Sequence, residues 1–136
     1  MEEGIIKTAP DREKAKSILK MVETTLEMIG VIDPKKYPSN VLKEYYEVIR
    51  ELITVILLLD GYKTQGEGAH KKLIEYLEKN YPEFKGHEIS LIDDLRILRN
   101  RIAYNGFFVT EDYPERKSKD IQAIIEKLKV IIYKKL

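Results

Sequence analysis

Residues 39–61 read SNVLKEYYEVIRELITVILLLDG, and this stretch decides the fold of the chain. Its apolar residues recur at helical spacing on two faces. The first face carries Leu42, Tyr45, Ile49, Leu52, Ile56 and Leu59, and the second carries Val41, Val48 and Val55. A helix that is apolar on two faces is either central in its bundle or shared with another subunit. We expect it to begin near Ser39, an N-cap residue, and to end at Asp60-Gly61.

Apolar periodicity on either side of this stretch predicts four further helices. Their expected ranges are about 11–29, 64–80, 88–104 and 118–135. Gly30 is expected to stop the first of these, Thr64-x-x-Glu67 to cap the next as a capping box, and Asn105-Gly106 to stop the fourth helix of the chain.

The connections between the expected helices are short. The longest runs from Asn105 through Pro114, and within it Phe107-Phe108-Val109 could form a short extended piece. One such run cannot build a sheet. The sequence therefore predicts an all-α fold, a five-helix, mostly antiparallel up-down bundle that forms a single domain over residues 1–136.

Composition excludes several classes of function. The chain has 136 residues, no Cys and a net charge of +1, so it has no disulfide, no thiolate chemistry and no global attraction to nucleic acid. It has no Gly-rich phosphate loop, and His70 and His87 have no partners at metal-ligand spacing. We therefore expect no metal site and no cofactor, and any anion site must be a local cluster.

The sequence also bears on location. The longest apolar run, residues 52–59, is much shorter than a bilayer span, and the acidic start Met1-Glu2-Glu3 is unlike a signal peptide. We expect a cytoplasmic protein with no membrane association. Abundant Glu, Lys and Ile fit a thermophilic source.

The segment Arg99-Asn100-Arg101-Ile102-Ala103-Tyr104 is the best candidate for a functional site. Because helix residues rotate by about 100° each, one side of this helix carries polar groups away from its apolar stripe. That side consists of Arg96, Arg99, Asn100, Ala103 and Tyr104. Arginine suits phosphate because its planar fork donates two parallel hydrogen bonds. The alternative is that Arg96 and Arg99 are surface residues paired with acidic side chains.

This segment resembles the HEPN superfamily (higher eukaryotes and prokaryotes, nucleotide-binding), whose members carry Arg-Asn-x-x-x-His late in the fourth helix. The Gly61-Tyr62-Lys63 turn and Leu98-Arg99-Asn100-Arg101-Ile102-Ala103 look like its small prokaryotic members. The resemblance covers roughly residues 11–136. It implies a bundle that dimerises so that two Arg/His motifs face each other across a cleft, where active members cleave RNA without metal. It also implies pairing with a minimal nucleotidyltransferase in a toxin–antitoxin module.

Carried over by position, Arg99 matches the motif arginine, which would grip phosphate and stabilise charge developing on phosphorus. Asn100 matches the polar residue after it, and Tyr104 stands where the family has His. A tyrosine near pKa 10 is a poor general base at neutral pH, but it can donate a hydrogen bond to phosphate or stack on a base. The resemblance also makes Tyr104 a hypothetical nucleotidylation target.

We therefore expect a homodimer that binds RNA or a nucleotide through Arg96, Arg99, Asn100 and Tyr104, with Arg99 and Tyr104 as catalytic candidates. The alternatives are an active metal-independent endoribonuclease and a non-catalytic protein-interaction subunit. His70 could replace the missing base, or be a cap or surface residue. Glu47 or Glu51 could hold Arg99, or belong to an ordinary charged face. Lys63 could reach a phosphate or be solvated.

Overall fold

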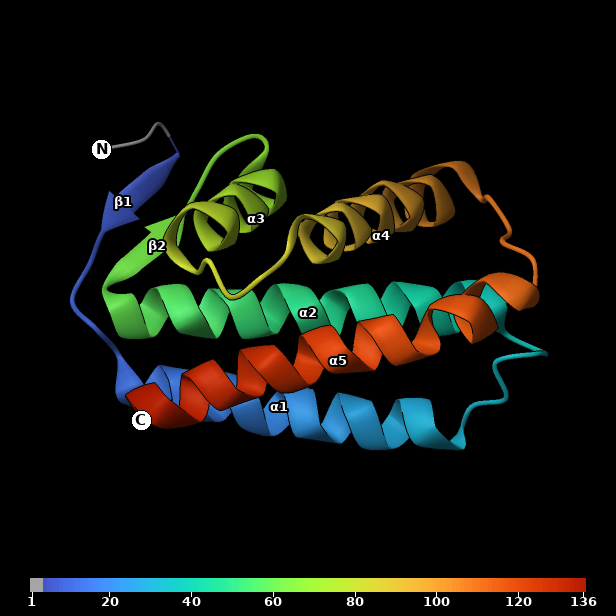
Figure 1. Ribbon diagram of the computed structural model, residues 1–136, viewed down its shortest axis with the longest axis horizontal. Coiled ribbons are helices and arrows are strands. Elements are labelled where there is room, and N and C mark those ends of the chain that lie inside the picture. Colours follow the sequence, from blue (N-terminus) through green and yellow to red (C-terminus); the bar gives the residue numbers. More distant parts are fainter. Residues whose placement is uncertain (1–3) are drawn as a thin grey trace.

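One long helix forms the centre of the molecule. In the computed structural model, which describes residues 4–136, α2 (Pro38–Asp60) contacts all four other helices. These are α1 (Arg12–Val31), α3 (Ala69–Asn80), α4 (Gly86–Asn105) and α5 (Asp112–Lys135). Figure 1 shows α3 and α4 on one side of α2 and α1 and α5 on the other, with α1 and α4 antiparallel to α2 and α5. The predicted all-α, five-helix, mostly antiparallel bundle is confirmed.

The two apolar faces of α2 explain its central place. Val41, Val48 and Val55 are buried, as are Leu42, Ile49, Leu52 and Ile56 on the other face. The rest of the chain covers both faces. The alternative that α2 shares its second face with another subunit is therefore wrong, and a homodimer would need a different surface.

A small sheet that the sequence did not predict joins the start of the chain to the end of α2. The strand β1 (Ile5–Lys7) pairs antiparallel with β2 (Tyr62–Thr64), so that Ile6 lies opposite Lys63. Thr64 is thus a strand residue, and the capping box predicted at Thr64-x-x-Glu67 is wrong. The helix α3 begins only at Ala69, after Gly68.

Other helix starts also differ from those predicted. Tyr37 is the N-cap of α2, because Pro38 already occupies its first turn. Ser39 is instead a buried residue whose Oγ accepts a hydrogen bond from the backbone N–H of Val109 at 2.9 Å. The helix α5 begins at Asp112, before the predicted Ser118, because a proline such as Pro114 is tolerated in a first turn.

The helix ends at glycine follow the sequence more closely. Gly61 and Gly106 have positive φ angles of 88° and 64° and close α2 and α4 as left-handed C-caps. Gly30 does not stop α1, which continues through Val31. Among residues 4–136, none of the helices combines the length and apolar character needed to cross a membrane.

Candidate functional site

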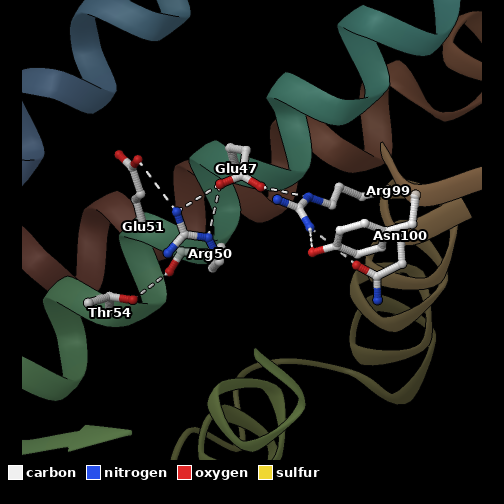
Figure 2. Close-up of polar contacts among 7 residues, drawn as sticks. Glu47, Arg50, Glu51, Thr54, Arg99 and Asn100 are labelled. Carbon is white, nitrogen blue, oxygen red and sulfur yellow. Dashed lines mark hydrogen bonds and ion pairs between the residues drawn. The ribbon is translucent and has the colours of Figure 1, made fainter. Parts of the chain in front are cut away.

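A single carboxylate on α2 joins two arginines from different helices. Oε1 of Glu47 accepts a hydrogen bond from Nε of Arg99 at 3.0 Å, and Oε2 accepts two from Arg50, at 3.0 Å from Nε and 2.7 Å from Nη2. Figure 2 shows the carboxylate of Glu47 between the two guanidinium groups. Both ion pairs are half-buried, with about a fifth to a quarter of each side chain exposed. This geometry fixes the orientation of Arg99.

The other side of Arg99 contacts residues of its own helix. Its Nη1 donates to Oδ1 of Asn100 at 3.3 Å and to the hydroxyl of Tyr104 at 3.2 Å. These three residues are the core of the predicted site, and the last turns of α4 place them together because positions 99, 100 and 104 lie on one side of the helix. Tyr104 is 74% exposed, so its ring and hydroxyl are open to a ligand.

The contacts of Arg99 also set its protonation. Partial burial opposes the charge, but the hydrogen bond with Tyr104 and the charge of Glu47 raise the pKa of Arg99 above its ordinary value. Arg99 is therefore a permanent cation. Among residues 4–136, its Nη2 has no hydrogen-bond acceptor. Nη2 therefore keeps donor capacity that no acceptor in the described chain uses.

His70, the predicted substitute base, lies in the first turn of α3. Its ring is 6.2 Å, centroid to centroid, from the ring of Tyr46, the residue before Glu47. Burial lowers the pKa of His70, and the guanidinium groups of Arg50, Arg99 and Arg96 lower it further against an opposing effect of Glu47. The imidazole is therefore neutral at neutral pH. No hydrogen bond within the described chain joins it to Arg99, Asn100 or Tyr104.

Three other predicted residues make no direct contact with Arg99. Nε of Arg96 donates to Asp93 at 2.8 Å, so Arg96 is paired within α4. Glu51 lies 3.7 Å from Nη2 of Arg50 and does not hold Arg99. Lys63 is exposed on β2, beyond the far end of α2, and about 20 Å of helix separates that end from Glu47. It does not belong to the same site.

Two residues of the site were not proposed from the sequence. Arg50 was not among the predicted site residues, yet it shares Glu47 with Arg99, and its spacing of three residues from Glu47 was the available signal. Tyr46 was not singled out, since it belongs to neither apolar set. It is nearly fully buried, which raises its pKa to about 12, and its ring lies beside that of His70.

Within residues 4–136, no three His, Cys, Asp or Glu side chains gather as a candidate metal site. Comparison with models of known protein families, with curated proteins and with solved structures found no match. The chemistry of the site thus has to be argued from its own residues.

Proposed function

We propose that this protein is a HEPN-like homodimer that binds RNA or a nucleotide, with Arg99 as the phosphate contact. One observation carries the proposal: Arg99, Asn100 and Tyr104 form one hydrogen-bonded group whose guanidinium is fixed from behind by Glu47. In the dimer, two such groups would face each other across a cleft. The protein would act as a subunit of a module paired with a nucleotidyltransferase.

The orientation of Arg99 supports phosphate binding. An arginine that is already held by a carboxylate on another helix loses less side-chain freedom on binding a ligand than a freely rotating arginine does. Arg99 shares its carboxylate partner Glu47 with Arg50, and Arg50 also lies 3.7 Å from Glu51. The ring of Tyr104 is exposed and lies 5.6 Å, centroid to Cζ, from the guanidinium of Arg99, which suits a nucleobase because stacking on an aromatic ring accepts any base.

The test is binding of fluorescently labelled single-stranded RNA, and of ATP, to Arg99→Ala. We expect affinity to fall by about tenfold or more, since a charge-assisted hydrogen bond contributes about 1.5–3 kcal/mol. The slope of the logarithm of RNA affinity against the logarithm of salt concentration should become less steep by about one. The matched control is Arg116→Ala, which removes an exposed arginine that is paired on its own helix with Asp112. Equal affinity of the two variants would contradict the proposal.

A ribonuclease is the second candidate, because His70 lies in the first turn of α3 beside Tyr46, the residue next to Glu47. A neutral imidazole can accept the proton of a ribose 2′-hydroxyl, whereas the phenol of Tyr104 cannot do so efficiently. The test is cleavage of labelled single-stranded RNA with EDTA present. Cleavage that disappears in both Arg99→Ala and His70→Gln would establish this activity. Cleavage unchanged by His70→Gln would exclude His70 as the base.

A non-catalytic interaction subunit is the third candidate. The exposure of Tyr104 supports it, because an exposed aromatic side chain beside a cation is a common feature of protein interfaces. Co-purification with a nucleotidyltransferase that is unaffected by Arg99→Ala or by excess nucleotide would favour this role. Mass spectrometry after incubation with that transferase and ATP would show whether Tyr104 receives a nucleotide.

A further inference from the structure

The outer face of α1 carries apolar side chains that nothing within residues 4–136 covers. Met21 is 58% exposed, Met28 42% and Val31 85%. Together with Ser17 and Thr24 they recur every three or four residues, so they form one stripe along the helix, on the side away from its buried residues. Thr24 is exposed, and its hydroxyl donates back to the carbonyl oxygen of Lys20.

Charged residues along one edge of this stripe alternate in sign. Glu13, Lys20 and Glu27 lie seven residues apart and therefore on the same edge. Lys20 and Glu27 are exposed, and neither makes an ion pair within the described part of the chain. Two unpaired opposite charges flank an uncovered apolar stripe, which is the pattern of a helix that pairs with another helix.

We propose that the outer face of α1 binds the same face of a second copy of this chain, with the two helices antiparallel. When two identical helices pair antiparallel, residues on the same edge meet, so Lys20 of each copy lies against Glu27 of the other. Met21 of each copy then packs against Thr24 of the other near the two-fold axis. Methionine suits such a contact because its flexible side chain adapts to an irregular surface.

The charges also disfavour the alternatives. Sliding the antiparallel pair by seven residues in one direction sets Lys20 against Lys20, and sliding it in the other sets Glu27 against Glu27. A parallel pair sets Lys20 and Glu27 against the opposite edge, whose residues Ile18, Thr25 and Ile32 carry no charge. The sequence of α1 therefore selects one orientation and one register.

This surface is separate from the Arg99 group. Figure 1 shows α1 and α4 on opposite sides of α2, so both surfaces can be used at once. Because α1 is about 30 Å long, a single helix pair covers less than the roughly 800 Å² per partner of a standard interface. The association is therefore reversible and rises with protein concentration.

Sedimentation velocity of charge-swapped variants tests the proposal. Lys20→Glu and Glu27→Lys, each alone, turn both attractive contacts of the pair into repulsive ones, and we expect each to weaken self-association by about tenfold or more. The double variant restores association. An equimolar mixture of the two single variants also restores it. One variant is then acidic at both positions and the other is basic at both, so each contact across the mixed pair joins opposite charges.

The matched control is Lys71→Glu and Glu78→Lys on α3, which are exposed, oppositely charged and also seven residues apart. These changes leave association unaltered. If Arg99 groups also mediate a dimer, wild type forms a larger assembly, and the α1 variants reduce it to that dimer. The proposal is overturned if wild type stays monomeric as concentration rises, if the single α1 variants associate like wild type, or if the mixture does not recover. RNA binding is measured separately with Arg99→Ala. A failure of the RNA-binding proposal would therefore leave the result of the sedimentation test unchanged.

Discussion

The carboxylate of Glu47 on α2 accepts a hydrogen bond from Nε of Arg99 on α4 at 3.0 Å, although 52 positions separate the two residues in the sequence. Both side chains are about one-fifth exposed, so solvent partly screens their charges. The contact therefore ties two helices together and orients Arg99 at the same time.

A double-mutant cycle with Glu47→Ala and Arg99→Ala should give a coupling energy of about 0.5–1 kcal/mol in the free energy of unfolding. Added salt should reduce it, because the pair is not fully buried. Urea denaturation of the four proteins measures the coupling. A value of zero at low salt would mean that the contact orients Arg99 without stabilising the fold.

His70 should make the stability of the protein depend on pH. Burial and the nearby guanidinium groups hold its pKa below 6.5 in the folded state, while in the unfolded chain it returns to that ordinary value. The unfolded state therefore takes up the proton first as the pH falls, so the contribution is present above pH 6.5 and is lost as the pH falls toward the folded pKa.

The measurement compares wild type with His70→Gln from about pH 8 to pH 5, where His is the side chain that ordinarily titrates. The difference in free energy of unfolding between the two proteins should change on acidification, to the disadvantage of wild type. An NMR titration of the imidazole gives the folded pKa directly. A pKa at or above 6.5 would contradict this prediction.

Gly61 and Gly66 allow a matched test of close packing at the end of α2. Both have φ above +80°, so alanine is strained at either position. A Cβ at Gly61 would also lie 3.0 Å from the carbonyl oxygen of Thr8, whereas a Cβ at Gly66 meets nothing within 4 Å. We expect Gly66→Ala to cost about 1 kcal/mol and Gly61→Ala distinctly more, by chemical denaturation. Equal costs would mean that the chain near Thr8 moves aside.

The hydroxyl of Ser39 should be needed to hold the chain that follows α4. It is buried, and the backbone N–H of Val109 donates to it. Ser39→Ala leaves that donor without its partner, so we expect a loss of about 1–2 kcal/mol in the free energy of unfolding and faster amide exchange at Val109. Ser90→Ala, at an exposed position on α4, should change neither quantity.

The sequence predicted the helices and the centre of the bundle because apolar periodicity is a strong signal over a helix of about twenty residues. The doubled apolar pattern of α2 left two alternatives, and only the packing of α1 and α5 decided between them. The sheet could not be predicted, because β1 is three residues long and its partner lies 57 positions later, from Ile6 to Lys63. A segment that short carries no periodicity of its own.

The predicted site was brought together only in part. Arg99, Asn100 and Tyr104 lie within six residues of one helix, so helical geometry alone places them on one side. Arg96 shares that side of the helix, but its guanidinium pairs with Asp93. Residues three positions apart on a helix are neighbours, so this carboxylate is within direct reach. Arg99 pairs with Glu47 and not with Glu51 because of the way α4 crosses α2. The crossing of two helices cannot be predicted from the local sequence of either one.

The order of the helices has a consequence for biosynthesis. The helix α5 is made after the other four helices, yet it is one of the main neighbours of α2, which is made before α3 and α4. While the chain leaves the ribosome, α1 and α2 can pair as a local hairpin, but the side of α2 that α5 covers stays bare until Asp112–Lys135 has been made, which ends 75 positions after Asp60. Nascent chains of this protein should therefore be clients of ribosome-associated chaperones, released only once α5 has been made.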